Sequence, residues 1–308
     1  MIIVDKNKFV RKPLVSVRIL TYNHEKYIRK AIESVLNQKC DFSFEIIIGE
    51  DCSTDSTRLI CLEYQKKHPE IIKLILNDNN VGLIKNYVNV TNEARGKYIA
   101  CCAGDDYWCD DYKLTKQVDF LKKNTDYSMC FTNAYEESNF SWEGYRKEVY
   151  GTAEDKEYLG SQILEYLIVP ASTVVYRNNL INYDFLLKRE FFAEDLIMYL
   201  KLNEFGKLRG MSDITTVYTR HTSSIMFKNS EEREKGFQTK IKYLMLIDDE
   251  LKYKYHNIIN RILTIAYYDV AKFKYKNGNR YQFIRYLFSS FSCNLILTLK
   301  LLFRSIIT

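Results

Sequence analysis

The chain has 308 residues, of which 46% are hydrophobic and 27% are charged, with only three prolines and eleven glycines. This composition is that of a globular protein, and it excludes disordered, fibrous and linker-rich chains. The net charge of +6 is uneven, because the residues from Leu251 onward carry ten Lys and Arg against one acid, Asp269, whereas the first 250 residues are net acidic.

Neither the N-terminus nor the cysteines indicate export. The first residues, MIIVDKNKFVRK, lack the apolar core of a leader, and no apolar run reaches the roughly 18 residues that span a bilayer. The eight cysteines have no metal-type spacing. Cys101 and Cys102 are adjacent in an expected strand, so we expect two separate core thiols on opposite faces. A reducing cytoplasm is therefore the expected location.

The first hundred residues alternate between strands and helices. Short β-branched runs predict strands, and apolar residues spaced at i, i+3 and i+4 predict helices. The expected strands are Leu14–Leu20, Phe44–Ile48, Ile71–Leu76 and Lys97–Cys102, and the expected helices are His24–Gln38, Thr54–Lys67 and Leu83–Ala94. This alternation predicts a parallel sheet built from βαβ units.

Polar clusters follow all four of these strands. They are Thr21–Asn23, Glu50–Asp55, Asn77–Gly82 and Asp105–Asp106. Ligands of parallel α/β sheets bind at the carboxyl ends of the strands, where the clusters fall. One polar turn means little, but four at one sheet edge predict a ligand site.

The pair Asp105–Asp106 ends the apolar run YIACCAG. Paired carboxylates at the tip of a buried strand suit a hard divalent cation, which takes oxygen ligands and often shares them with a substrate phosphate. The same two residues also fit a turn, or the cap of a helix that begins near Tyr112. The pair alone favours neither interpretation.

The remainder of the chain is less regular. Its expected elements are a helix over Tyr112–Lys123, a strand over Ser128–Ala134, a loop or hairpin over Asn139–Gly151, a helix over Leu159–Ile168, a strand over Ser172–Tyr176, a helix over Glu194–Phe205, a strand over Leu208–Tyr218, and helices from about Glu231 to the end. We expect two domains, over residues 1–228 and 229–308.

Several motifs carry a family resemblance. The run VSVRILTYNHEKYIRKAIESVLNQ, the run FEIIIGEDCSTDST, the NDNNVG turn and the run YIACCAGDDYW occur in the order and spacing of family 2 glycosyltransferases. The resemblance covers about Pro13 to Ser224. It implies an α/β fold of the GT-A type, with a mostly parallel central sheet that binds a nucleotide-sugar, followed here by a helical C-terminal region.

The implied activity is an inverting transfer of a sugar from a nucleotide diphosphate, most simply a UDP-sugar, to a saccharide or lipid-linked glycan in surface polysaccharide biosynthesis. Thr21 and Tyr22 then line the nucleotide pocket, and Asp51 accepts a hydrogen bond from the base. An Asx-turn with Ser53 is the alternative for Asp51. Asn86 falls where the family often places a polar residue near the base or ribose.

The resemblance also implies a metal site. Asp105 is the expected ligand with Asp106 beside it, and Mn²⁺ or Mg²⁺ is the expected ion, which neutralises the departing diphosphate. His221 matches a family histidine close to the diphosphate or metal, with a purely structural role as the alternative, and Arg220 is expected to support the phosphates. The chain departs from the family at Ala103, where an acid usually precedes the metal-binding aspartate.

The pair Glu194–Asp195 resembles the acidic pair that the family places beside the acceptor. We expect Asp195 to be the general base and Glu194 to bind acceptor beside it. Because a helix N-terminus lowers a carboxylate pKa, burial or a fixed hydrogen bond must tune the base. The alternative is two ordinary first-turn acids. Trp108 is expected either under the metal loop or facing acceptor.

The C-terminal region is basic and rich in aromatic residues, with Lys272, Lys274 and Lys276 alternating with Phe273 and Tyr275. Basic amphipathic helices attach to anionic membranes, which predicts a peripheral location at the inner face of the cell membrane. A helical cap on the core or a homo-oligomer contact are the alternatives. No nucleic-acid-binding motif accompanies the charge, so no nucleic acid partner is expected.

Two other functions are alternatives to the enzyme. A dinucleotide-dependent enzyme of Rossmann type is excluded, because no G-x-G-x-x-G follows the first strand. A degenerate relative that binds nucleotide-sugar or a partner enzyme without turnover is favoured by Ala103, whereas Asp51, Asp105 and Glu194–Asp195 favour the enzyme.

Overall fold

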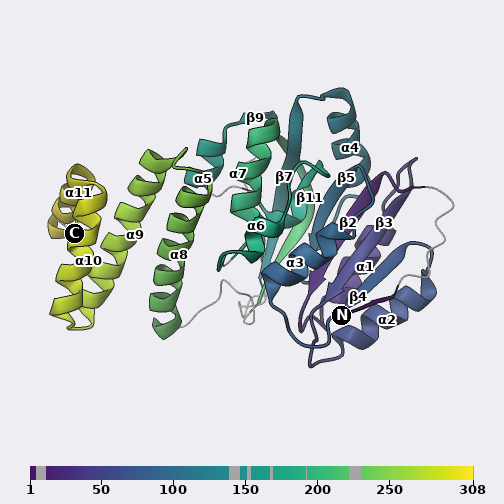
Figure 1. The fold of residues 1–308 in the computed structure, drawn as a ribbon, viewed down its shortest axis with the longest axis horizontal. Coiled ribbons are helices and arrows are strands. Elements are labelled where there is room, and N and C mark those ends of the chain that lie inside the picture. Colours follow the sequence, from purple (N-terminus) through teal and green to yellow (C-terminus); the bar gives the residue numbers. More distant parts are fainter. Residues whose placement is uncertain are drawn as a thin grey trace. The chain divides into compact units, whose positions relative to one another are not determined.

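The computed structural model describes residues 1–4, 12–138, 146–150, 154–166, 169–191, 193–221 and 230–307 (Figure 1). The chain divides into two compact units, Met1–His221 and Thr222–Thr308. This division falls a few residues before the boundary expected from the sequence.

Within its described residues, the first unit is built on a single mixed sheet of eleven strands. They are β1 (Ile2–Val4), β2 (Val15–Thr21), β3 (Phe44–Glu50), β4 (Ile72–Leu76), β5 (Tyr98–Ala103), β6 (Tyr107–Trp108), β7 (Tyr127–Ser138), β8 (Arg146–Tyr150), β9 (Lys156–Tyr158), β10 (Val175–Arg177) and β11 (Lys207–Arg220). The order is β1-β4-β3-β2-β5-β10-β7-β11-β6, with β8 beside β7 and β9 beside β11. The four predicted N-terminal strands β2 to β5 pair in parallel, which confirms the βαβ prediction.

The helices of this unit connect the strands. They are α1 (Ile28–Leu36), α2 (Thr57–Lys67), α3 (Leu83–Asn92), α4 (Lys113–Lys123), α5 (Gly160–Tyr166), α6 (Asp184–Leu187) and α7 (Asp195–Phe205), with a 3₁₀ turn η1 at Ala171–Thr173. The predicted starts of α1 and α2 were too early, at His24 and Thr54. The polar residues before α1 and α2 form hydrogen bonds between the segment that follows β2 and the segment that follows β3. The His24 backbone N–H donates to Thr57 Oγ1 at 2.8 Å, and the Thr54 backbone N–H donates to Asn23 Oδ1 at 2.8 Å.

The sheet buries apolar side chains on both faces, as a parallel α/β sheet requires. Along β2, Val15, Val17 and Ile19 are fully buried in the larger core, together with residues of α1, α2 and α4. The alternate residue Arg18 contacts α3 on the opposite face, because successive strand residues point to opposite sides. Strand alternation also separates Cys101 from Cys102, and both are free thiols, as predicted.

The second half of the unit departs from simple alternation. β10 is antiparallel to both β5 and β7, and β7 is parallel to β11. β8 is antiparallel to β7, which confirms the hairpin predicted in this region, although residues 139–145 lie outside the described residues. The two-residue strand β6 was not predicted, and it pairs with β11.

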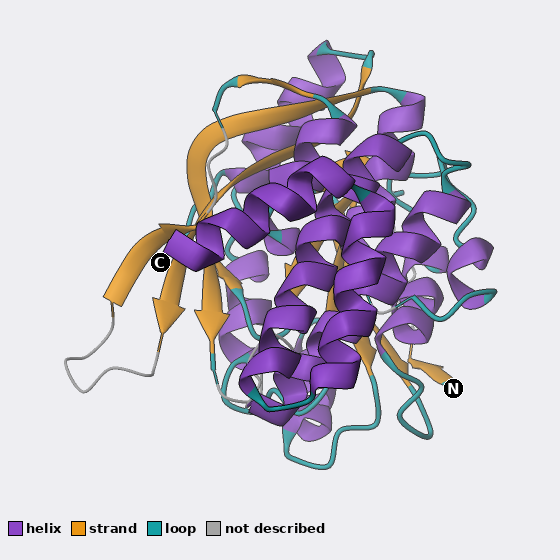
Figure 2. Cartoon of the chain, turned by 90° about the vertical axis from the view of Figure 1, so that its left-hand side faces the viewer, coloured by secondary structure: helices purple, strands orange, loops and turns teal. Residues whose placement is uncertain are grey.

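The second unit is helical, as predicted. It contains α8 (Ser230–Glu250), α9 (His256–Lys276), α10 (Arg280–Cys293) and α11 (Leu295–Ile307), and Figure 2 draws helices in purple and strands in orange. α9 packs against the other three through buried residues such as Ile259, Leu263 and Val270. Within the described residues, none of the helices combines the length and the apolar composition that crossing a bilayer requires.

Candidate functional site

Three separate segments bring together His24, Asp105 and His221. β2 is parallel to β5, and the intervening antiparallel β10 makes β7 and β11 run the same way as β5. The carboxyl ends of β2, β5 and β11 therefore meet at one sheet edge, and one of these residues follows each strand. Asp105 Oδ2 lies 3.2 Å from His221 Nε2 and 3.7 Å from His24 Nε2. Potential ligand atoms of all three residues lie within 4.8 Å of one another.

The surroundings hold this cluster in place. The ring of Tyr27 stacks on that of His221, with centroids 4.6 Å apart and 19° between the planes. A Cβ atom on Gly104 would lie 2.8 Å from both Thr21 Oγ1 and His24 Nδ1, so only glycine lets the Asp105 loop approach the end of β2 this closely. Thr21 Oγ1 and His24 Nδ1 are both buried and have no hydrogen-bond partner in the described part of the chain.

The electrostatics of the cluster suit a cation. Burial alone raises the pKa of Asp105, but the hydrogen bond with His221 and the charge of His24 bring it below its usual value. Burial lowers the pKa of His24, against the opposing effect of Asp105. The cluster at neutral pH therefore offers one carboxylate and the neutral imidazole of His24, both of which are metal-binding forms.

Asp106 lies outside this cluster, contrary to its predicted place on the metal. Its Oδ2 pairs with Ser172 Oγ at 2.5 Å and its Oδ1 accepts the Thr219 N–H at 3.0 Å. Burial, followed by the charge of Asp105, raises the pKa of Asp106 to about 8. Since both of its oxygens are engaged, Asp106 joins the β5 loop to η1 and β11, whereas Asp105 faces the two histidines.

Trp108 packs beneath this loop. It is 4% exposed, and its Nε1–H donates to the Ser172 carbonyl oxygen at 3.0 Å. The buried Lys113 ammonium lies 4.6 Å from the ring centroid. Of the two positions expected for Trp108, the structure gives the one under the loop.

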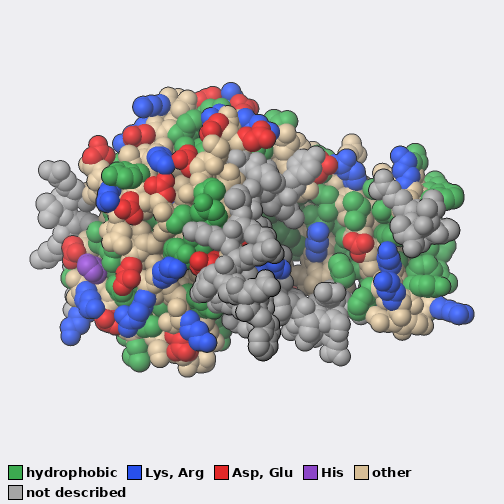
Figure 3. Space-filling view, turned by 180° about the vertical axis from the view of Figure 1, so that it is seen from behind, with side chains coloured by type: hydrophobic (Ala, Val, Ile, Leu, Met, Phe, Trp, Pro, Cys, Tyr) green, Lys and Arg blue, Asp and Glu red, His purple; other side chains and the backbone are tan. Residues whose placement is uncertain are grey.

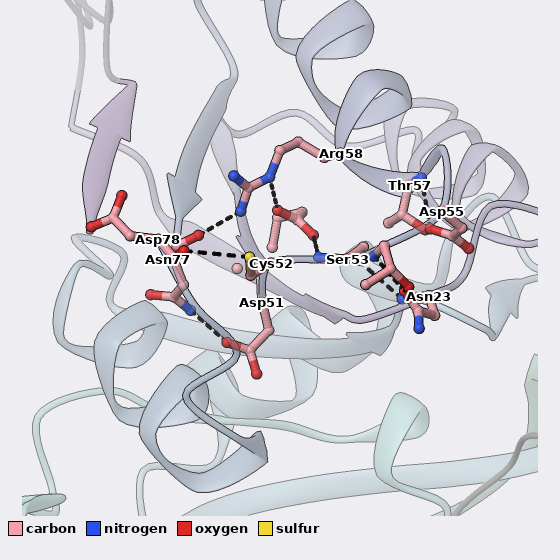
Figure 4. A network of polar contacts seen from close by, with 12 residues as sticks. Asn23, Asp51, Cys52, Ser53, Asp55, Thr57, Arg58, Asn77 and Asp78 are labelled. Carbon is pink, nitrogen blue, oxygen red and sulfur yellow. Dashed lines mark hydrogen bonds and ion pairs between the residues drawn. The ribbon is translucent and has the colours of Figure 1, made fainter.

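Asp51 and Asn86 belong to a buried polar network at the ends of β3 and β4, shown around Asp51 and Asn77 in Figure 4. Asp51 accepts hydrogen bonds from the Val81 and Gly82 N–H groups and from Asn77 Nδ2, each at 2.9 Å. Asn77 Nδ2 also lies 3.2 Å from Asn86 Oδ1. Three of the roughly four acceptor positions of the Asp51 carboxylate are thus occupied, and one remains for a ligand.

The loops after β2 and β3 form one connected surface. The Asn23 N–H donates to Ser53 Oγ at 3.0 Å, and both Asn23 and Cys52 adopt positive φ angles of 56° and 59°. The Ser53 N–H donates to Glu50 Oε1 at 2.6 Å, so no Asx-turn joins Asp51 to Ser53 through this group. Tyr22 is 41% exposed on this surface, whereas Thr21 is buried.

Glu194 and Asp195 form a second acidic group at the start of α7. Glu194 is the N-cap and only 8% exposed, and Asp195 Oδ1 accepts the Leu196 N–H at 2.7 Å. Burial raises the pKa of Glu194 to about 7, with the charge of Arg18 opposing it, and burial also raises the pKa of Asp195. The expected lowering by the helix dipole is therefore outweighed by desolvation.

Arg18 provides the positive charge near this pair. Its guanidinium lies 3.9 Å from the centroid of the Tyr87 ring and donates to Thr91 Oγ1 and Cys101 Sγ, each at 3.3 Å. It is 8% exposed. Arg18 was not predicted as a site residue, although an arginine within an otherwise apolar strand run was a visible signal.

Arg220 is not brought to the Asp105 cluster. Its Nη1 lies 3.1 Å from Glu136 Oε1, its side chain is 51% exposed, and the adjacent His221 is buried. Adjacent residues of an extended chain point to opposite sides, which explains the separation. His24, in contrast, was missed as a site residue because the apolar periodicity placed it inside a helix.

A family model described as glycosyl transferase family 2 matches residues 16–181. A protein of Mycobacterium tuberculosis with no assigned function is 30% identical over 233 residues, which are 73% of this chain and 64% of that protein. TuaG of Bacillus subtilis, named for teichuronic acid biosynthesis, is 38% identical over 114 residues, 37% of this chain and 44% of TuaG. The chain thus spans less than two thirds of the length of these relatives.

Two solved structures show a similar fold. TarS of S. aureus in complex with UDP-GlcNAc has a TM-score of 0.60 at 18% identity, over 91% of this chain and 81% of the TarS chain. The mannosyltransferase PcManGT of Pyrobaculum calidifontis, in complex with GDP-Man and Mn²⁺, has a TM-score of 0.55 at 14% identity, over 93% of this chain and 88% of its own. At these identities the likeness is one of fold.

Proposed function

This chain belongs to glycosyltransferase family 2 and has the GT-A fold, and from this premise we propose that it transfers a sugar from a nucleotide diphosphate to an acceptor hydroxyl with inversion at the anomeric carbon. The observation that carries the proposal is that a cluster around Asp105, whose ligand atoms could hold a cation, occurs together with a separate acidic pair, the buried Glu194 and the half-buried Asp195. The first suits a departing diphosphate and the second suits an attacking hydroxyl.

A divalent ion, Mn²⁺ or Mg²⁺, is held in this proposal by Asp105 and His221. Their donor atoms, 3.2 Å apart, fit two neighbouring positions around one ion, because ligands about 2.1 Å from an ion and at right angles lie about 3 Å apart. When bound, the ion neutralises the negative charge that develops on the leaving diphosphate. Asp106 keeps the loop in shape, and Arg220 has no proposed contact with the phosphates.

The nucleotide is proposed to lie over the ends of β2, β3 and β4. Thr21 Oγ1 and Asn77 Oδ1 are buried polar atoms without a partner in the described chain, as expected where a ligand completes the hydrogen bonds. Tyr22 offers an exposed ring for the base, and Asp51 has one acceptor position left for a base N–H. Asn86 shapes this pocket through Gly49, whose carbonyl accepts its Nδ2–H at 2.9 Å. We propose a UDP-sugar, by analogy with the UDP-GlcNAc of TarS.

Asp195 is the proposed general base. Its carboxylate accepts the proton of the acceptor hydroxyl, while the hydroxyl oxygen bonds to the anomeric carbon and the bond from that carbon to the diphosphate oxygen breaks. Burial brings the pKa of Asp195 above its usual value, which makes it a better proton acceptor than an exposed aspartate. Glu194 lies beside it and binds the acceptor. The acceptor is proposed to be a growing saccharide or lipid-linked glycan of a surface polysaccharide, as the name of TuaG suggests.

Nucleotide binding is tested by thermal unfolding with UDP, GDP and dTDP, each with and without Mn²⁺. UDP with Mn²⁺ is expected to raise the melting temperature most, since a ligand at 100 times its Kd adds about 2.7 kcal/mol to the free energy of unfolding. A larger shift with GDP or dTDP would contradict the choice of donor. A folded protein that responds to no nucleotide would contradict the proposal as a whole.

A binding protein without turnover is the second candidate. Ala103 favours it, because this side chain cannot supply the acid that usually precedes the metal-binding aspartate. The two functions differ in one measurement, release of UDP from a UDP-sugar in the presence of acceptor saccharide. Nucleotide-dependent stabilisation without such release would support the binding protein.

We further propose that the C-terminal unit contacts an anionic membrane surface. Its last two helices expose many large apolar side chains: Tyr281, Ile284 and Phe288 on α10, and Leu295, Ile296, Leu299 and Phe303 on α11. Figure 3 shows hydrophobic and basic side chains close together on the surface of this unit. Apolar side chains beside Lys and Arg match the interface of an anionic bilayer, which attracts basic segments by about 1 kcal/mol per residue.

Vesicle co-sedimentation tests this contact. We expect the protein to bind vesicles that contain phosphatidylserine, to release at high salt, and to bind neutral vesicles less. The double variant Phe288→Ser, Phe303→Ser should lose binding, whereas Leu59→Ser, which removes a 69% exposed leucine of the first unit, should not. Equal binding to neutral vesicles, or a stable dimer in place of vesicle binding, would contradict the proposal.

A further inference from the structure

We propose that His24 is a third protein ligand of the ion at Asp105, and that it makes the site prefer Mn²⁺, Co²⁺ or Zn²⁺ over Mg²⁺. This inference rests on the proposed metal role of Asp105 and adds a ligand and a metal class to it. It assigns a function to the segment between β2 and α1, which the sequence resemblance left without a metal-binding residue.

The distances place His24 within reach of the same ion. Two donors about 2.1 Å from an ion, at angles between octahedral and tetrahedral, lie about 3.0 to 3.4 Å from each other. The two histidines lie 3.2 and 3.7 Å from the same Asp105 oxygen, close to this range before any ion draws them in. The two imidazole rings are at 81° to each other, with centroids 6.2 Å apart, so they meet edge-to-face at the carboxylate.

The backbone and the packing, rather than a competing hydrogen bond, fix the ring of His24. The backbone N–H of His24 donates to Thr57 Oγ1, the ring of Tyr27 lies edge-on at 6.4 Å from the imidazole, and Gly104 leaves just enough room for the imidazole. Nδ1 is buried and has no hydrogen-bond partner within the described residues. An ion that binds His24 therefore breaks no side-chain contact except the one with Asp105.

His24 matters because Ala103 occupies the position from which the family usually supplies an acid. The residue two positions before Asp105 carries no ligand atom on its side chain, and its N–H donates to Ser172 Oγ at 2.9 Å. A third protein donor must then come from another segment, and among the described residues His24 is the one that lies close enough. The result is two imidazoles and one carboxylate in place of two carboxylates. Imidazole nitrogen suits Zn²⁺ and Co²⁺ best and Mn²⁺ less strongly, whereas Mg²⁺ is bound through carboxylate, carbonyl and water oxygen.

Metal binding to the full chain without nucleotide tests the inference. Mn²⁺ is titrated by the loss of its free-ion EPR signal, Co²⁺ by its visible absorption, and Mg²⁺ by competition with Mn²⁺. We expect the wild-type protein to bind Mn²⁺ at least about tenfold more tightly than Mg²⁺. His24→Gln should weaken Mn²⁺ binding about tenfold to a hundredfold and change the Co²⁺ spectrum, with little effect on Mg²⁺.

Two further variants test whether the change in metal binding comes from the imidazole of His24. His68→Gln removes a histidine at the end of α2, next to Glu70, and should leave Mn²⁺ affinity unchanged. His24→Asp replaces the imidazole with a carboxylate, so it should restore binding and shift the preference toward Mg²⁺. The melting temperature of each metal-free variant reports whether it folds.

The outcomes separate this inference from the proposed function. If His24→Gln keeps the affinity and the Co²⁺ spectrum of the wild type while Asp105→Asn loses both, His24 is not a ligand and the glycosyltransferase site stands. If Asp105→Asn also binds metal normally, the metal site itself is overturned. A His24→Asp variant that folds but keeps the wild-type preference would overturn the metal class.

Discussion

Asp105→Asn is expected to lower kcat/KM by about a hundredfold or more and to abolish the Mn²⁺-dependent stabilisation by UDP. The substitution keeps the shape of the side chain but removes the negative charge that faces both histidines. An ion on a departing diphosphate is worth several kcal/mol, and 1.36 kcal/mol corresponds to tenfold in rate. Steady-state kinetics with UDP-sugar and thermal unfolding with UDP measure the two effects.

The matched control is the neighbouring residue. In Asp106→Asn, the amide can donate to Ser172 Oγ and its oxygen can accept the Thr219 N–H, so both contacts of Asp106 are preserved. This variant should fold and bind metal nearly as the wild type does. Equal losses in the two variants would mean that Asp105 and Asp106 share the ion after all. Normal activity in Asp105→Asn would remove the metal from the mechanism.

Asp195→Asn is expected to lower kcat by about 10² to 10⁴, the range that general-base catalysis contributes, with little change in metal-dependent UDP binding. The amide cannot accept the acceptor proton, and the Asp105 cluster belongs to other segments of the chain. Single-turnover rates at saturating donor, together with the UDP thermal shift, check both parts. A variant that loses UDP binding as well would indicate that Asp195 supports the donor site.

Glu194→Gln separates the two acids through pH. The folded pKa of Glu194, about 7, lies above its usual value of 4.5. Its contribution to stability is therefore complete below about pH 4.5 and is lost as the pH rises through about 7. This loss corresponds to about 3 kcal/mol between pH 4 and 9. The free energy of unfolding, measured with denaturant at each pH in this range, should decline by about this amount less in Glu194→Gln than in the wild type. If the two proteins lose free energy of unfolding in parallel as the pH rises, the pKa of Glu194 is not shifted.

The parallel half of the fold could be predicted because its signals are local. Each of β2 to β5 is a short apolar run followed by polar residues, and the alternation with helices fixes their direction. β6 carries no such signal, since two residues show no periodicity. The strand predicted over Ser172–Tyr176 is present only in part, as β10 (Val175–Arg177), because the 3₁₀ turn η1 occupies Ala171–Thr173. The places of β6 and β10 depend on pairing with β11, β5 and β7.

The site was predictable in type but not in detail. Polar residues at strand ends indicated Asp105 and Asp51, but sequence spacing could not show that Asp106 is held by Ser172, or that Asn77 joins Asp51 to Asn86. These contacts link segments far apart in the chain. Strand alternation, in contrast, already implied that Arg220 and His221 point to opposite sides, so that only one of them reaches the Asp105 loop.

The distance along the chain between the clustered residues sets the order in which they can meet during folding. β2 to β5 assemble through consecutive βαβ units, whereas His221 is 116 residues from Asp105 and arrives only after β11 has docked beside β7. Long-range pairing of this kind closes late, because it costs the most loop entropy. An ion held by all three side chains, as proposed above, would bind only the completed sheet, so it would slow unfolding without speeding the first steps of folding.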